Sequence, residues 1–170
     1  TGADNKLIVP GIPGAGDRTL MVAAPGDGDA IVTLRILGSQ GPFSPAENNV
    51  VTVPSGTVLD VPVGNAVGGE PAAIELTSDR PIVAGLRAVA TKDGGSPDFA
   101  YTAPAVALER LGATLGSRTT NGWTTDLVFT AGGTQSGEAT VDILDPAGAI
   151  VGKQDVLVTA GSTQVVRIAP

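Results

Sequence analysis

The 170-residue chain contains no histidine and no cysteine. Their absence excludes Ser-His-Asp and Cys-His catalysis, zinc sites with His or Cys ligands, disulfides, and haem or iron–sulfur ligation. Aromatic residues are also scarce, with one Trp, one Tyr and three Phe, and no apolar run reaches the ~18 residues that a membrane-spanning helix needs. We therefore expect a protein that is not an enzyme and that holds neither a cofactor nor a transition metal.

Positive charge is in short supply as well. Ten Lys and Arg residues face seventeen Asp and Glu residues, which gives a formal net charge of −7. An acidic protein is repelled by phosphate backbones and anionic headgroups. Nucleic acid and anionic lipid are therefore disfavoured as partners on charge grounds, and we expect no nucleic-acid binding.

What the chain has in abundance is glycine, proline and short alternating segments. The 24 Gly and 13 Pro interrupt helical runs, and apolar and polar residues alternate with period two between turn-forming clusters. This pattern predicts an all-β chain built as a tandem or pseudo-duplicated, immunoglobulin-like antiparallel β-sandwich. We expect strands near residues 6–10, 19–24, 30–37, 50–53, 57–63, 72–77, 82–91, 99–104, 124–130, 138–144, 155–159 and 163–168.

An internal repeat supports the duplication. Placing Leu20 on Leu127 aligns LMVAAPGDGDAIVTLRIL with LVFTAGGTQSGEATVDIL, and a two-residue deletion then aligns VTVPSGTVLDVPV with VLVTAGSTQVVRI. We predict a β-sandwich module in residues 1–98 and a second, related module in residues 99–170 that lacks the last two strands. The second module is either cut short, or completed by another chain or by the first module.

One segment has two interpretations. Ala105, Leu108 and Leu111 have helical spacing after Pro104, so residues 102–116 could form a short helix. The same residues could equally form an extended connector.

A glycine-rich loop offers the strongest candidate for a metal site. Asp27 and Asp29 lie in PGDGDA, and oxygen ligands of this kind can begin a calcium site. The favoured interpretation is a bend between strands, because Asp and Gly suit turns and the matching loop GGTQSG has no acid. We therefore expect no metal and keep the two aspartates only as weak candidates.

For the other acidic residues we expect structural roles and no catalytic one. The pairs Glu70/Glu75 and Asp142/Asp145 could be compared with glycosidase carboxylates, but period-two alternation sends Glu75 and Asp142 to outward, solvated strand faces. In TSDRPIVAG, we expect a tight turn between two strands, with an Asx-type hydrogen bond from Asp79.

Two lone aromatic residues are weak ligand candidates. Exposed rings are the usual platform for sugars, and Tyr101 and Trp123 are the only residues of their kinds. A binding role would require both rings on one exposed face, whereas burial of Trp123 as a cap of the second module is the structural alternative.

The segments PGDGDAIVTLRILGSQG and TSDRPIVAG look like recurring segments of a family of uncharacterised secreted or envelope-associated proteins of actinobacteria. The resemblance covers most of residues 18–110. It implies tandem β-sandwiches, an extracytoplasmic location, and secretion or anchoring through a segment absent from this sequence. No catalytic residue is implied, because the family's domain has no known function.

These observations favour a non-enzymatic, extracytoplasmic structural or binding module of the cell envelope, with envelope proteins or glycans as partners. A carbohydrate- or peptidoglycan-binding module is the alternative. Seven Arg against three Lys, in a chain rich in Ala, Gly, Val and Thr, also suit a GC-rich genome.

Overall fold

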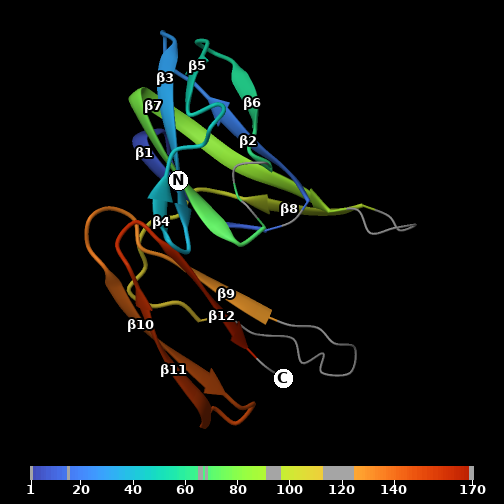
Figure 1. Ribbon diagram of the computed structural model, residues 1–170, viewed down its shortest axis with the longest axis vertical. Coiled ribbons are helices and arrows are strands. Elements are labelled where there is room, and N and C mark those ends of the chain that lie inside the picture. Colours follow the sequence, from blue (N-terminus) through green and yellow to red (C-terminus); the bar gives the residue numbers. More distant parts are fainter. Residues whose placement is uncertain are drawn as a thin grey trace.

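The computed structural model describes residues 2–14, 16–64, 67, 69–90, 97–112 and 125–168. Every regular element in this part of the chain is a β-strand, and all paired strands are antiparallel (Figure 1). The expected all-β class and antiparallel sheets are therefore confirmed. The described segments include no helix that is long and apolar enough to cross a membrane.

Eight strands form the larger, N-terminal sandwich. They are β1 (Asp4–Ile12), β2 (Asp17–Ala23), β3 (Ala30–Gly38), β4 (Gly41–Phe43), β5 (Val50–Val53), β6 (Val58–Pro62), β7 (Ala72–Ala90) and β8 (Asp98–Thr102). In one layer β7 lies between β1 and β3, and β3 also pairs with β4 and β5. In the other layer β7 lies between β8 and β2, and β2 pairs with β6.

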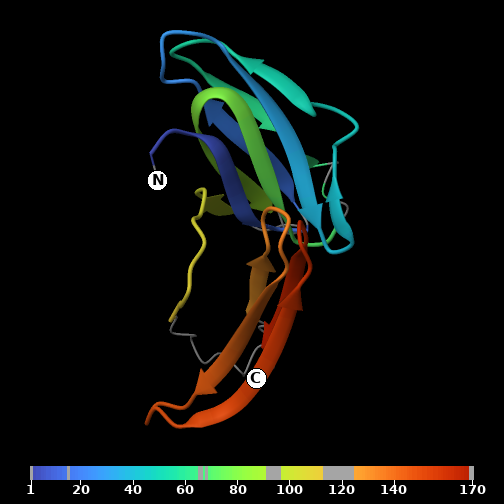
Figure 2. The same ribbon diagram turned by 90° about the vertical axis from the view of Figure 1, so that its left-hand side faces the viewer.

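Strand β7 belongs to both layers, which the sequence did not predict. Its first half pairs with β3 through Ala73 to Ser78, and its second half pairs with β2 through Val83 to Val89. Figure 2 shows β7 arching over one end of the sandwich. The expected tight turn at residues 77–81 is therefore wrong, because the chain bends there without leaving the β conformation.

The core lies between these two layers. Alternating residues of β2, β3 and β7 are fully buried, as the period-two pattern requires. The largest fully buried side chains are Ile12, Leu20, Leu34, Ile36, Leu37, Ile74, Leu76, Ile82, Leu86, Val9, Val22 and Val32.

A smaller unit follows, made of two strand pairs. Its strands are β9 (Thr125–Thr130), β10 (Gly137–Leu144), β11 (Ile150–Val158) and β12 (Thr163–Ile168). Strand β9 pairs with β12, and β10 pairs with β11. Only Val156, Val158 and Val166 among its described apolar residues form a buried cluster, with several half-buried neighbours packed against them.

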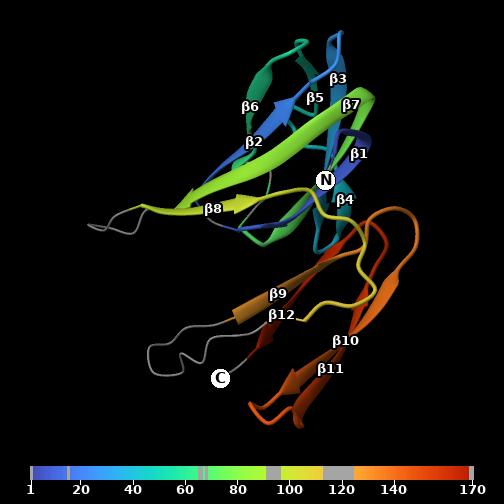
Figure 3. The ribbon, with the colours of Figure 1, turned by 180° about the vertical axis from the view of Figure 1, so that it is seen from behind.

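Strand β8 joins the larger sandwich. We expected this strand in the second module, but β8 pairs with β7 through Phe99 opposite Val89 and Tyr101 opposite Arg87. Residues 103–112 then run from β8 toward the smaller unit without regular structure (Figure 3). For the described part of residues 102–116, the extended connector is therefore the correct alternative.

The two units touch at their ends. The Thr163 hydroxyl donates a buried hydrogen bond of 2.7 Å to the carbonyl oxygen of Leu37. A Cβ atom at Gly161 would lie 3.1 Å from Pro42 Cγ, so the absence of a side chain permits this close approach. The smaller unit thus extends away from the larger sandwich (Figures 1 and 2).

Candidate functional site

The two aspartates of the PGDGDA loop have different surroundings. Asp29 accepts a hydrogen bond of 2.9 Å from the Ser55 amide, and Asp27 is exposed. In the matching loop of the smaller unit, the Ser136 hydroxyl accepts the equivalent bond from the Ala160 amide at 3.1 Å. An uncharged serine makes the same hydrogen bond at the aligned position, so this bond does not require a carboxylate. In both units the bond joins two loops. The described residues contain no group of three acids that could hold a metal.

Glu75 is more buried than expected. We predicted a solvated outward carboxylate, but Glu75 is 5% exposed. Lys6 Nζ lies 2.9 Å from one carboxylate oxygen and Arg35 Nη1 lies 3.4 Å from the other. These two long side chains, from the strands on either side of β7, cover the carboxylate and neutralise it. The other member of the pair, Glu70, accepts a hydrogen bond from Ser39.

The remaining singled-out acids also have structural partners or are solvated. The Asp79 carboxylate accepts a hydrogen bond of 2.8 Å from the Ile31 amide of strand β3, so the expected local Asx bond is not formed. Asp145 accepts bonds from the amides of Ala147 and Ala149 and thereby holds the turn between β10 and β11. Asp142 is exposed, as expected.

An exposed ion pair joins β9 and β12. Arg167 Nε donates to Asp126 Oδ1 at 2.8 Å, and Nη2 donates to Oδ2 at 3.0 Å. This forked hydrogen bond holds the pKa of Asp126 below its ordinary value and raises the pKa of Arg167. The pair joins residues that lie directly opposite each other in the β9–β12 ladder.

A polar hollow lies on the outer face of the layer formed by β6, β2, β7 and β8. Its volume is about 640 Å³. We call it the sheet-face hollow; its polar lining residues are Asp17, Arg18, Thr19, Glu47, Asn48 and Arg87. Thr19 pairs with Arg87 in the β2–β7 ladder, so alternate outward residues of both strands form its floor.

Two arginines and two carboxylates balance the charge of this hollow. Arg18 is fixed, because its guanidinium donates to the carbonyl oxygens of Pro13 at 2.7 Å and Gly64 at 2.6 Å. The Nε atoms of Arg18 and Arg87 are buried and have no hydrogen-bond partner among the described residues. A polar lining with balanced charge suits an uncharged, oxygen-rich ligand better than an anion.

Two exposed aromatic rings lie beside the hollow. Phe99 and Tyr101 are 56% and 71% exposed, and their spacing of two residues on β8 places them on one face. Tyr101 lies directly opposite Arg87 across the β7–β8 ladder. Trp123 falls outside the described residues. Phe99 was not singled out from the sequence, although its alternation with Tyr101 in DFAYT was a readable signal.

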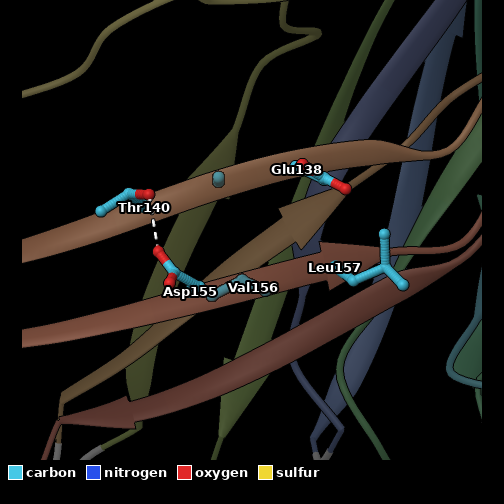
Figure 4. Close-up of a pocket in the computed structure, with 6 residues that line it drawn as sticks. Glu138, Thr140, Asp155, Val156 and Leu157 are labelled. Carbon is cyan, nitrogen blue, oxygen red and sulfur yellow. Dashed lines mark hydrogen bonds between the residues drawn. The ribbon is translucent and has the colours of Figure 1, made fainter.

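A second, shallower hollow lies over the β10–β11 pair. It has a volume of about 560 Å³ and includes Glu138, Thr140, Asp155 and Leu157 (Figure 4). The Thr140 hydroxyl donates to the Asp155 carboxylate at 2.7 Å, so this carboxylate is used within the hairpin. Glu138 is the other carboxylate among the lining residues.

Comparison with known proteins identifies the family. Residues 1–169 match a family model described as a family of unknown function, DUF5719. The chain belongs to the DUF5719 family. No curated protein matches the chain.

One solved structure resembles this DUF5719 chain. The structure described as "Crystal Structure of Thermotoga maritima 1070" superposes with a TM-score of 0.50 at 18% identity, and the match covers 62% of this chain and 96% of that one. At this identity the likeness concerns the fold alone.

Proposed function

We propose that this DUF5719 chain is a non-enzymatic structural or binding module of the cell envelope. The observation that carries the proposal is the use of carboxylates as structural ties: Asp29 and Asp79 bind backbone amides, and Glu75 is neutralised by two cations. Acid–base catalysis needs a carboxyl group that is available and tuned. A protein whose singled-out acids hold loops and strands together is better suited to scaffolding or binding.

The proposed location is extracytoplasmic, in a secreted protein or in one anchored through a segment outside this sequence. Its support is the resemblance of PGDGDAIVTLRILGSQG and TSDRPIVAG to actinobacterial envelope proteins. Envelope proteins or glycans are the partners that such a location offers.

We also propose that the two units descend from one duplicated module. In the larger sandwich Leu20 of β2 faces Val61 of β6, and in the smaller unit their aligned counterparts, Leu127 and Val166, face each other. A backbone hydrogen bond at the turn is repeated as well. The Gly56 amide donates to the Ala24 carbonyl at 2.8 Å, and the aligned Gly161 amide donates to the aligned Ala131 carbonyl at 2.8 Å. Shared register and shared turns support common ancestry.

Carbohydrate or peptidoglycan binding is the second candidate. Its specific support is the row formed by Phe99, Tyr101 and the sheet-face hollow. Sugars stack on exposed rings through their C–H faces and hydrogen-bond through their hydroxyls, and this row offers both surfaces side by side.

Titration of the full chain with chitin oligomers and soluble peptidoglycan fragments, followed by NMR, separates the two candidates. Tyr101→Ala is the test variant, and Phe43→Ala, which removes an exposed ring on β4, is its matched control. Glycan binding that is lost only in Tyr101→Ala supports the carbohydrate candidate. Absence of glycan binding, with retention of the chain in isolated envelopes, supports a structural role. Turnover of any of these glycans would refute the non-enzymatic proposal.

A further inference from the structure

Strands β9 and β10 each have one unpaired edge within the described part of the chain. Strand β9 pairs with β12 alone, and β10 pairs with β11 alone. Their aligned counterparts in the larger sandwich, β2 and β3, are each paired on both sides, and in both cases the second neighbour is β7. The described part of the smaller unit therefore has the strands that flank β7 but no equivalent of β7.

The correspondence between the units holds residue by residue. In the larger sandwich, Val32 of β3 lies opposite Val51 of β5, and in the smaller unit their counterparts Ala139 and Val156 lie opposite each other. The same holds for the β2–β6 and β9–β12 pairs described above. Because both registers are conserved, the edges of β9 and β10 lie where a β7-like strand would pair with them.

Burial shows what the smaller unit lacks. Four inward residues of β2 and β3 are 0% exposed, because β7 inserts Ile74, Leu76 and Leu86 between the layers. Their counterparts on β9 and β10 are only half-buried. The aligned pairs are Leu20 and Leu127, Val22 and Phe129, Leu34 and Val141, and Ile36 and Ile143.

The larger sandwich does not fill these edges. It touches the smaller unit at one end, through the bond from Thr163 to Leu37, the approach of Pro42 to Gly161, and the close approach of Ile8 of β1 to Gly132, which follows β9. No described strand of the sandwich pairs with β9 or β10. The two edges run away from this contact, as Figures 1 and 2 show.

We propose that β9 and β10 form an acceptor for one extended strand of a partner polypeptide, which takes the place that β7 takes between β2 and β3. Unpaired edges with half-buried apolar faces recruit strands by β-augmentation. The partner strand pairs first with β10, bends, and then pairs with β9. By analogy with β7, it needs alternating apolar residues on its inward face and a bend near its centre.

Charge further specifies this partner strand. In the larger sandwich Arg35 of β3 lies beside Glu75 of β7. The aligned counterpart of Arg35 on β10 is Asp142, which is exposed and lies opposite Lys153 of β11 in the ladder. The sign of the acceptor is thus reversed, and the partner strand carries Lys or Arg at the position equivalent to Glu75.

Two peptides test this inference on the full chain. One has the sequence of residues 72–90, and the other has the same sequence with Glu75→Lys. At a concentration a hundred times the dissociation constant, bound peptide slows amide exchange in β9 and β10 by about a hundredfold, because exchange then requires release of the peptide. The Lys peptide binds up to about fivefold more tightly, the upper end of the range measured for exposed ion pairs.

A charge exchange checks the register. Asp142→Lys should reverse the preference between the two peptides, whereas Asp60→Lys, an exposed aspartate on β6 with no role in the acceptor, should leave it unchanged. A third peptide with Ile74→Asp and Leu86→Asp should not bind, because its inward face is polar. Neither exposed aspartate variant removes a packed side chain, so both should fold.

Three results would overturn the inference. One is that neither of the two peptides protects the amides of β9 and β10 from exchange. Another is protection of β2 and β3 instead, which means that the peptide has displaced β7. The third is self-association of the chain with β9 and β10 already protected, which makes a second copy the occupant. The acceptor is separate from the Phe99 and Tyr101 face, so the two tests fail independently.

Discussion

Ile36 and Ile143 occupy aligned positions in the two units, which makes them a matched pair for measuring what β7 contributes. Ile36 is 0% exposed, whereas Ile143 is half-buried. Ile36→Ala should destabilise the larger sandwich by about 2–5 kcal/mol, because it removes buried methyl groups and leaves a closed cavity. Ile143→Ala should cost about 1–2 kcal/mol, because roughly half of the transfer free energy is lost and no closed cavity remains.

The assay must report on each unit separately. Urea denaturation followed by hydrogen exchange and mass spectrometry gives the free energy of unfolding for peptides from β3 and from β10. The milder variants Ile36→Val and Ile143→Val guard against failure to fold, with an expected cost of about 0.5–1.5 kcal/mol at Ile36 and less at Ile143.

Equal costs at the two positions would refute the reasoning. They would mean that the side chain of Ile143 is as fully packed as that of Ile36, and that the smaller unit is complete without a β7-like strand. Addition of a peptide that fills the acceptor should raise the cost of Ile143→Ala toward that of Ile36→Ala and leave the latter unchanged.

Three further predictions concern polar contacts. Thr163→Val should weaken the contact between the units by about 1–3 kcal/mol, since the buried carbonyl of Leu37 loses its donor; exchange of amides at the contact checks this. Asp79→Ala should destabilise β3 by about 1 kcal/mol and Asp79→Asn by less, measured by urea denaturation, because the amide retains an acceptor oxygen. NMR titration should give Asp126 a pKa below 3.8, and this pKa should return toward 3.8 in Arg167→Gln. The stabilisation by this pair is present above the pKa of Asp126 in the unfolded chain, and it is lost as the pH falls through the pKa of Asp126 in the folded protein.

Local periodicity predicted the strands well. The expected strand at residues 30–37 is β3, and the expected strands near 50–53 and 163–168 are β5 and β12. Strands of this kind are specified by their own alternation and by the turns beside them. β4 was missed because three residues are too short to show a period.

It was harder to predict which strands pair and which residues meet than to predict where the strands lie in the sequence. The sequence TSDRP contains turn-forming residues, yet β7 passes through it as one strand, because Asp79 bonds to β3 and the bend lets a single strand serve both layers. The sheet-face hollow could not be predicted either, since Asp17, Asn48 and Arg87 come from segments far apart in the sequence that meet only in the folded chain.

Glu75 and Ile143 together show why alternation predicts a face but not burial. Glu75 points outward, yet it is buried because strands on both sides of β7 supply Lys6 and Arg35 to cover it. Ile143 points inward, yet it is only half-buried because no described strand pairs with the free edge of β10. Burial in a sheet depends on neighbouring strands as much as on the direction of the side chain. An inward apolar residue that remains half-buried therefore marks an incomplete edge, and in this chain such residues gather on β9 and β10.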